Sequence, residues 1–391
     1  MEKVPVSVLK PGDVIDQNIY TEDLKLLLVK GTELTADILR RLSARGITEI
    51  LTDSKMIIEL GKKRAAEEAG QAGESAPPAE EPEMPQQEEL KEFISDIGLK
   101  PILEPAFFRQ SLEHVSKVIT QVITGSSADK KALAELAREL IAKVLGTNGT
   151  ALMLYEMAQH DQYEYAHAIR TATLFITLNK DEIAVSAELE ALVQGVLMHN
   201  VGMLRVPEEI RLKPGRLTPD EFRRIKKHPP DGVEMLSSSL PLAQAAMEMI
   251  AAHHERLDGQ GYHRGLADKD IPFQALILSI CDCYDALITD RPFRKALQPS
   301  NAINLLIQDD VRHFGSKVLH RLLRKVGLYP VGTVVLLNTG ELGIVTKINP
   351  MFFKQPVVHL MYDRNHVRIG DPQPVNLAES RDRFIWKAIG K

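Results

Sequence analysis

Cysteine, tryptophan and long apolar runs are all scarce in this sequence. It contains 2 cysteines and 1 tryptophan among 391 residues. Cys281 and Cys283 stand on either side of Asp282, too close in a predicted helix to pair, so we expect free thiols that pack between helices. No apolar run approaches the ~20 residues that a membrane helix needs, and the first residues lack the apolar core of a signal peptide. We therefore expect a cytoplasmic protein with no membrane span.

An excess of charge of either sign is also lacking. The 48 basic and 53 acidic residues leave a net charge of -5, which gives no broad basic surface. This balance argues against a nucleic acid polymer as the main partner. The fractions of hydrophobic (44%) and charged (26%) residues are typical of a globular protein, and the length predicts roughly two to three domains.

The N-terminal part predicts a small module of its own. Residues 1–55 combine short apolar strands at 4–9, 25–29 and 47–51 with a helical pattern over 35–45. This mixture indicates an α+β unit.

The next segment differs in composition. Residues 56–97 are rich in glutamate and proline and hold few large apolar side chains over most of their length. Such a segment cannot bury enough apolar surface to offset its chain entropy. We predict a flexible acidic linker here, and an acidic interaction segment is the alternative.

The remainder predicts a helical domain followed by a smaller β region. Apolar residues recur at helical spacing from 98 to 327, with the core of this domain at 150–300. Residues 328–391 contain β-branched runs around an Asn-Thr-Gly turn, which is typical of a β appendage. The expected fold class is therefore mainly α, a helical bundle with a small module at each end.

One helix within this domain is especially well marked. Thr218 and Glu221 form a capping-box pattern, and Pro219 suits the first helical position. Pro229 is expected to end the helix, which would place His228 in its last turn.

Six residues of metal-ligating type are spread over the helical domain. They are His167, His199, His228, the adjacent pair His253 and His254, and Asp282. Histidine is the commonest metal ligand among side chains, and helices of a bundle can bring distant residues into one core. We predict that the six meet in one metal-binding pocket.

Residues 161–297 resemble the HD-GYP domain, a branch of the HD metal-dependent phosphohydrolases whose members hydrolyse cyclic di-GMP. The resemblance rests on the ordered histidines together with the segments Ile210–Thr218 and Asp282–Ala296. The Tyr-Pro-Val-Gly passage at 329–332 and the N-terminal module also resemble segments that accompany this domain. The resemblance implies an HD-type helical bundle.

The resemblance also implies a set of site residues. The metal ligands would be His167, His199, His228, His253, His254 and Asp282, holding one or two divalent transition metal ions, iron or manganese. The catalytic residues would be His199, Asn200 and Asp282. Tyr262, Arg291 and Arg294 match positions that contact the substrate, and arginine suits a phosphodiester because its fork pairs two oxygens.

This sequence departs from the family pattern at four positions. Asn200 replaces the aspartate of the His-Asp dyad, which removes a bridging negative charge. Met203 replaces a lysine, and His263 replaces the proline of Gly-Tyr-Pro. Tyr163 stands where some members place an additional acidic ligand, which argues against a third metal. We expect weakened or lost hydrolysis.

Two functional hypotheses follow. The first is a phosphodiesterase that hydrolyses cyclic di-GMP or a related cyclic dinucleotide. The second is a catalytically silent receptor or scaffold that uses the same pocket, and a scaffold that binds neither metal nor nucleotide is a third, weaker reading. A signalling protein could bind through the loop Gly261-Tyr262-His263, and a homodimer is a further expectation.

Four further carboxylates near the predicted site are expected to act indirectly. Asp285 and Asp290 would brace the arginines, and Glu255 and Asp258 would order the loop after the histidine pair.

Overall fold

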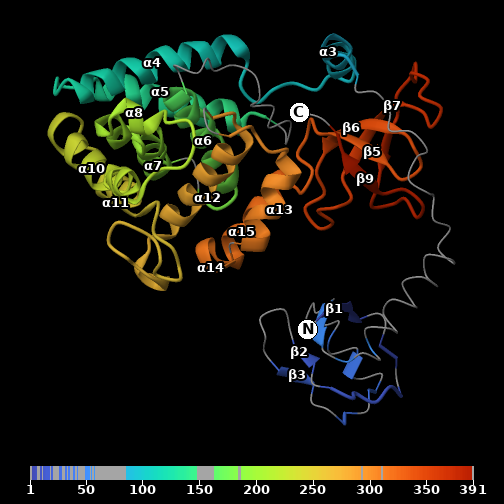
Figure 1. The fold of residues 1–391 in the computed structure, drawn as a ribbon. Helices are drawn as coiled ribbons and strands as arrows, with labels where there is room; N and C mark the ends of the chain where they lie inside the picture. Colours follow the sequence, from blue (N-terminus) through green and yellow to red (C-terminus); the bar gives the residue numbers. More distant parts are fainter. Residues whose placement is uncertain are drawn as a thin grey trace. The chain divides into compact units, whose positions relative to one another are not determined.

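The computed structural model describes most of the chain after residue 84 and a minority of the residues before it (Figure 1). The described residues are 2–6, 9–10, 12–17, 19–20, 26–28, 31–32, 34–35, 38–39, 42, 49–52, 54, 57, 85–147, 163–183, 186–291, 294–309 and 311–389. The chain divides into two compact units, Met1–Pro77 and Pro78–Lys391.

The first unit contains a four-stranded antiparallel sheet. Its strands are β1 (Glu2–Pro5), β2 (Ile19–Tyr20), β3 (Leu26–Leu28) and β4 (Glu49–Thr52), in the order β1-β4-β2-β3. Buried aliphatic residues, among them Ile15, Ile19 and Ile50, form a core separate from that of the second unit. Of the helix expected over residues 35–45, positions 35, 38, 39 and 42 are described, and the last three are helical.

The second unit is mainly helical, as the sequence predicts. Its helices, in chain order, are α3 (Gln87–Asp96), α4 (Pro105–Ile123), α5 (Lys130–Leu145), α6 (Tyr163–Asn179), α7 (Ala187–Met198), η3 (Val201–Arg205), α8 (Glu208–Arg211), α9 (Pro219–Ile225), α10 (His228–Ser239), α11 (Gln244–Ala252), η4 (Asp268–Asp270), α12 (Phe273–Ile288), α13 (Pro299–Asp309), α14 (Val311–Phe314) and α15 (Ser316–Val326).

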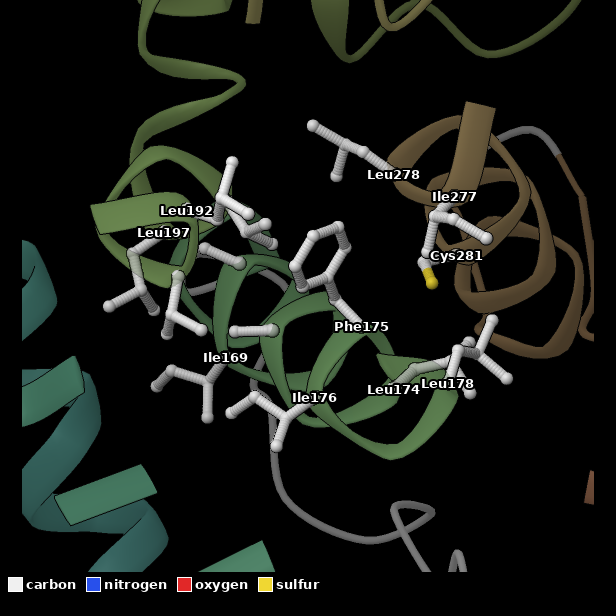
Figure 2. Packing of buried hydrophobic residues seen from close by; sticks show 14 of the residues in the cluster. Ile169, Leu174, Phe175, Ile176, Leu178, Leu192, Leu197, Ile277, Leu278 and Cys281 are labelled. Carbon is white, nitrogen blue, oxygen red and sulfur yellow. The ribbon is translucent and has the colours of Figure 1, made fainter. Parts of the chain in front are cut away.

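Helix α6 is the centre of the bundle. Every residue from Ala166 to Asn179 is buried, and α5, α7 and α12 pack around it. Figure 2 shows Phe175 lying between side chains of α7 and α12, with Leu192 on one side and Leu278 on the other. A helix covered on all sides carries few charges, and the arginine that it does bury has a carboxylate partner described below.

The histidine predicted in the last turn of a helix lies instead at the start of the next one. Helix α9 ends at Ile225, and α10 begins at His228 with prolines in its first turn. Proline is accepted there because the first helical N–H groups have no partner within the helix. Pro229 therefore opens a helix, and the prediction that it ends one is wrong. The capping box of Thr218 and Glu221 is confirmed.

The C-terminal region forms a five-stranded antiparallel sheet. Its strands are β5 (Val334–Leu337), β6 (Leu342–Lys347), β7 (Val357–Tyr362), β8 (Pro374–Asn376) and β9 (Ile385–Ala388), in the order β8-β7-β6-β5-β9. The predicted Asn-Thr-Gly turn joins β5 to β6, with Gly340 at φ +91°. The sequence did not predict β8 or β9, which are short.

The prediction of a flexible linker over residues 56–97 is wrong at the C-terminal end of this range, where helix α3 forms. Helix α3 lies beside the C-terminal sheet (Figure 1). It buries Phe93, which packs in one cluster with Leu336, Ile344 and Met361 of that sheet. Leu90, Phe93, Ile94 and Ile97 recur at helical spacing, a signal that the surrounding acidic composition obscured. Residues 58–84 lie outside the described part of the chain.

Within the described residues, no helix has the length and apolar character needed to cross a membrane. Cys281 and Cys283 are free thiols on α12, and Cys281 is part of the bundle core, as expected.

Candidate metal centre and phosphate pocket

The six predicted metal ligands come together at the ends of four helices and on α12. They form two groups, in each of which the ligand atoms lie within 4.8 Å of one another. One group consists of His167, His199 and Asp282, and the other of His228, His253 and His254. The ring centroids of His199 and His253 are 5.2 Å apart, so the two groups are adjacent.

Hydrogen bonds to the backbone fix the orientation of three of these imidazoles. In each case Nδ1 lies at hydrogen-bond distance from the carbonyl oxygen three residues earlier in the chain. The pairs are His199 with Val196 (2.7 Å), His228 with Ile225 (2.9 Å) and His253 with Ile250 (2.6 Å). A carbonyl accepts only, so Nδ1 carries the proton and Nε2 keeps a lone pair directed at the pocket.

A carboxylate orients His167 in the same way. Its Nδ1 lies 2.7 Å from Oδ2 of Asp285. Arg170 donates to both oxygens of that carboxylate, from Nε at 2.7 Å and from one terminal nitrogen at 3.0 Å. All three side chains are buried, so the positive charge of Arg170 compensates the negative charge of Asp285 where water cannot.

Asp282 is the one carboxylate in the two groups, and it reaches both. Its Oδ1 lies 2.9 Å from Nε2 of His167 and 3.9 Å from Nε2 of His199. Its Oδ2 lies 3.9 Å from Nε2 of His254. One carboxylate oxygen therefore faces each group.

The electrostatics favour neutral imidazoles in the all-histidine group. Burial is the main cause that lowers the pKa of His228 to about 3 and that of His254 to about 4, and nearby histidines act in the same direction on both. Burial also holds the pKa of His253 well below its usual range. Neutral imidazole is the form that binds metal, so this group is prepared for a cation at neutral pH.

The other group carries charge. Burial opposes the protonation of His167, but hydrogen bonds to Asp282 and Asp285 outweigh it and raise the pKa to about 9. Burial opposes the ionisation of Asp282, but His167 and His199 hold its pKa well below the usual range. A proton on His167 thus occupies a position that a metal cation can take.

The donor set fits a divalent transition metal. The Nε2 atoms of His167 and His199 are buried and face Oδ1 of Asp282, at 2.9 Å and 3.9 Å. Imidazole nitrogens combined with a carboxylate suit iron, manganese or zinc. Four of the five histidines are oriented by a hydrogen bond through Nδ1, and such hydrogen bonds are typical of metal ligands.

Asn200 directly follows the ligand His199 and opens η3. It is half-buried, and its backbone carbonyl accepts a hydrogen bond from the amide of Met203 at 2.9 Å. η3 is pressed against the start of α10, where a Cβ added at Gly202 would lie 2.0 Å from the carbonyl oxygen of His228. Glycine at this position therefore allows two ligand-bearing segments to approach.

Two of the three predicted substrate residues face the histidines. The Tyr262 ring stacks on His254, with ring centroids 4.7 Å apart and planes 23° apart. The guanidinium of Arg291 lies 5.0 Å from the ring centroid of Tyr163, which in turn stacks on His167.

The third predicted substrate residue has a structural task that the sequence did not indicate. Arg294 donates to the carbonyl oxygens of Ala286 at 2.5 Å and Leu287 at 3.1 Å. Its guanidinium therefore caps carbonyls in the last turns of α12. Contact between Arg294 and substrate stays a prediction.

The four carboxylates expected to act indirectly have distinct partners. Asp285 braces His167 and Arg170 rather than the predicted arginines. Glu255 accepts from the backbone amides of Arg264 at 2.6 Å and Leu266 at 2.9 Å, which confirms its loop-ordering role.

Asp258 also orders its loop, accepting from the Gln260 amide at 3.0 Å. Asp290 accepts from the Ala296 amide at 2.7 Å and so orders the segment after α12. Sequence reasoning missed Arg170, whose signal was a lone charge in an apolar helix. Lys226 also lies at the site, with its ammonium 5.3 Å from the Tyr262 ring centroid.

Comparisons with known proteins agree with this geometry. A family model described as an HD domain matches residues 156–318, and a second, described as a KOW domain associated with HD domain, matches residues 334–391. A cyclic di-GMP phosphodiesterase of Pseudomonas aeruginosa, PA4108, is 33% identical over 67% of this chain and 63% of its own length. Residues 156–318 therefore match an HD domain, and the resemblance of this segment to the HD-GYP family is confirmed.

Other relatives match shorter stretches. The cyclic di-GMP phosphodiesterase response regulator RpfG of Xanthomonas campestris is 30% identical over 50% of this chain and 48% of its own length. The 3′3′-cGAMP-specific phosphodiesterase 1 of Vibrio cholerae is 34% identical over 40% of this chain and 36% of its own length. The chain thus spans less than two thirds of each of these relatives.

Among solved structures, the HDG"Y"P protein Bd1817 of Bdellovibrio bacteriovorus matches with a TM-score of 0.46 and 19% identity. That match covers 82% of this chain and 97% of the other.

Proposed function

We propose that this protein binds a cyclic dinucleotide in the histidine pocket and cleaves one of its phosphodiester bonds in a metal-dependent reaction. Relatives named for the hydrolysis of cyclic di-GMP and of 3′3′-cGAMP support this substrate class. Cyclic di-GMP is the expected substrate, because most of the relatives carry its name.

The observation that carries the proposal is the position of Asp282 between two histidine groups. One oxygen faces His167 and His199, and the other faces His254. Iron or manganese held by these residues would supply Lewis acidity toward the phosphate and would activate water. The carboxylate of Asp282 would help to hold a cation in either group while the imidazoles stay neutral.

Two other side chains act on the nucleotide directly. Arg291 offers a guanidinium for a phosphate oxygen, and this charge matters because Met203 supplies none. Tyr262 offers an aromatic face beside His254, on which a guanine base or the ribose can pack. The ammonium of Lys226 beside that ring adds attraction for an anionic ligand.

Turnover is expected to be slow. With Asn200 in place of aspartate, the two groups contain one carboxylate, and two divalent cations would retain excess positive charge. Each ~1.4 kcal/mol of lost transition-state stabilisation lowers the rate tenfold. A second candidate function, a receptor that binds the nucleotide without cleaving it, is favoured by Asn200 and Met203 together.

Several narrower features belong to the same proposal. The loop Gly261-Tyr262-His263 would bind a signalling partner, and His263 is exposed there. A homodimer and a cytoplasmic location are also proposed, consistent with the lack of a membrane-spanning helix in the described residues.

The test measures metal content and cyclic di-GMP turnover on the full chain, purified without oxygen and supplied with iron or manganese. Bound metal together with formation of linear product supports the phosphodiesterase. Bound nucleotide without product, in a protein that holds metal, supports the receptor. Turnover that disappears in His254→Ala would exclude the receptor, and failure to bind either metal or nucleotide would contradict both.

A further inference from the structure

Tyr163 and Arg291 form a small cluster beside the metal-ligating histidines. The Tyr163 ring lies nearly parallel to that of His167, at 10° and a centroid distance of 5.6 Å. The guanidinium carbon of Arg291 lies 5.0 Å from the centroid of the same phenol ring. Imidazole, phenol and guanidinium are thus neighbours.

Both members of this cluster bury a polar atom that has no hydrogen-bond partner outside the cluster. The atoms are the hydroxyl oxygen of Tyr163 and Nε of Arg291. Among the described ion pairs, none involves Arg291. The two carboxylates whose charge acts on it have other partners: Oδ1 of Asp282 lies 2.9 Å from Nε2 of His167, and Glu164 lies 3.8 Å from a terminal nitrogen of Arg211. A buried donor without a partner is unfavourable and is typical of a site that a ligand completes.

The chemistry of the two donors selects an anion. A phenol is protonated at neutral pH and a guanidinium is charged. The hydroxyl therefore keeps its proton at neutral pH and can donate, and Arg291 remains a cation. A phenol and a guanidinium offer two donors, one positive charge and no anionic oxygen, so they suit a phosphate oxygen and disfavour a metal.

We propose that Tyr163 and Arg291 together form a phosphate-binding subsite, in which the Tyr163 hydroxyl and Arg291 Nε donate to oxygens of the phosphodiester. The subsite deepens the proposed function, on which its natural ligand rests. Tyr163 stands at the position where some family members place an acidic ligand, and the subsite gives it a role. The subsite also provides hydrogen-bond donors for the phosphate, which the side chain of Met203 lacks.

The hydroxyl can be removed without disturbing the metal ligands. His167 is held by Asp285 through Nδ1, and its Nε2 faces Asp282, so Tyr163 contributes only its ring face to that histidine. Tyr163→Phe keeps this face and deletes one oxygen. Tyr165→Phe makes the same chemical change two residues later on α6, at a partly buried position of the bundle core, and serves as the matched control.

The experiment measures binding of inorganic phosphate and of cyclic di-GMP to the manganese-loaded full chain by calorimetry, with metal content measured in parallel. Tyr163→Phe is expected to weaken both ligands about tenfold at unchanged metal content, since a buried hydrogen bond to a charged group is lost. Arg291→Lys retains the charge, loses the Nε donor, and should weaken binding similarly. Tyr165→Phe should bind both as the wild type does.

The outcomes separate this subsite from the proposed function. Wild-type affinity in Tyr163→Phe, or loss of metal with loss of affinity, would overturn the subsite while leaving the phosphodiesterase intact. Phosphate binding that depends on Tyr163, without any binding of cyclic di-GMP, would support the subsite and contradict the proposed function. A metal-loaded wild type that binds neither ligand would overturn both.

Discussion

The Nδ1 atom of His167 and the Oδ2 atom of Asp285 are 2.7 Å apart, although 118 positions separate the two residues in the sequence. This contact joins α6 to α12 through a metal-ligating histidine. The same carboxylate neutralises Arg170, which otherwise would be an isolated charge inside the bundle core. One side chain therefore supports both the fold and the geometry of the metal centre.

Replacing Asp285 by asparagine should lower both the stability of the fold and the metal affinity of the centre. The amide cannot compensate the buried charge of Arg170, and breaking such a pair costs about 3–5 kcal/mol. His167 would then donate to a neutral amide oxygen at best instead of to a carboxylate, which should lower metal affinity about 10–100-fold. Thermal unfolding and metal content of Asp285→Asn would measure the two effects. Glu234→Gln, which alters an exposed ion pair with Arg205, is the control and should change neither quantity appreciably.

The two groups should load with metal unequally. His167, His199 and Asp282 combine two imidazoles with an anionic oxygen, whereas His228, His253 and His254 are three neutral imidazoles. We expect a manganese titration to resolve a tight and a weak binding event. His228→Ala should remove only the weak event, and Asp282→Asn should weaken both, because each carboxylate oxygen faces one group. A single event of two equivalent ions in the wild type would contradict this expectation.

Gly202→Ala should disrupt the approach of η3 to α10. The new Cβ would lie 2.0 Å from the backbone carbonyl oxygen of His228 and 2.6 Å from the amide nitrogen of Gly232, so one segment must move. Displacing His228 should reduce the metal content and lower the melting temperature. Gly370→Ala, where nothing lies within 4 Å of the added Cβ, is the matched control. Full metal content in Gly202→Ala would show that the contact is not needed.

The metal-free protein should lose stability toward acid pH. The pKa values of His228 (about 3) and His254 (about 4) are depressed from 6.5, so the unfolded chain takes up protons that the folded chain does not. Their contribution is complete above pH 6.5 and is lost as the pH falls toward 4. His167, with a pKa raised to about 9, acts oppositely: its contribution is complete below pH 6.5 and is lost as the pH rises through 9.

Melting temperatures in the presence of a chelator, between pH 5 and pH 9, would check this dependence. Because the pKa values of three histidines of the pocket are depressed and that of one is raised, the acid side should be steeper. His254→Gln should flatten the acid side and leave the alkaline side unchanged. A melting temperature that rises steadily down to pH 5 would be inconsistent with neutral imidazoles in this pocket.

Much of the metal centre could be predicted from the sequence because its ligands are chemically distinctive. Five histidines and Asp282, in family order, predicted a single pocket, and the structure brings the six together as two adjacent groups. Helix existence was predictable for the same kind of reason, since buried residues recur with the helical period from α4 to α15.

What escaped prediction depended on tertiary contacts. Arg294 carries the same charge as Arg291, and only the fold directs its guanidinium to the carbonyls at the end of α12. The partnership of Asp285 with Arg170 spans 115 positions, and no local pattern encodes it. The role of Pro229 could not be predicted because proline both ends and begins helices. The start of α10 places Nε2 of His228 3.3 Å from Nε2 of His253, a contact between two helices that the sequence does not show.

Restoring the family residues should raise the rate of hydrolysis. Asn200→Asp returns a second carboxylate next to His199, and Met203→Lys returns a cation one turn of η3 later. The carboxylate should increase the affinity for the weakly held metal, because it reduces the uncompensated positive charge of the pocket. The lysine should stabilise the charge that develops on the phosphate during cleavage. Turnover of cyclic di-GMP in the double variant should exceed that of the wild type by at least about tenfold, a change of about 1.4 kcal/mol.

The single variants separate the two causes. Asn200→Asp should change the metal titration, whereas Met203→Lys should change turnover at constant metal content. Asn200→Ser, which adds no charge, is the control for the first. If the double variant binds two metal ions tightly and still yields no linear product, the loss of activity lies elsewhere in the pocket, and the receptor function becomes the better account of this chain.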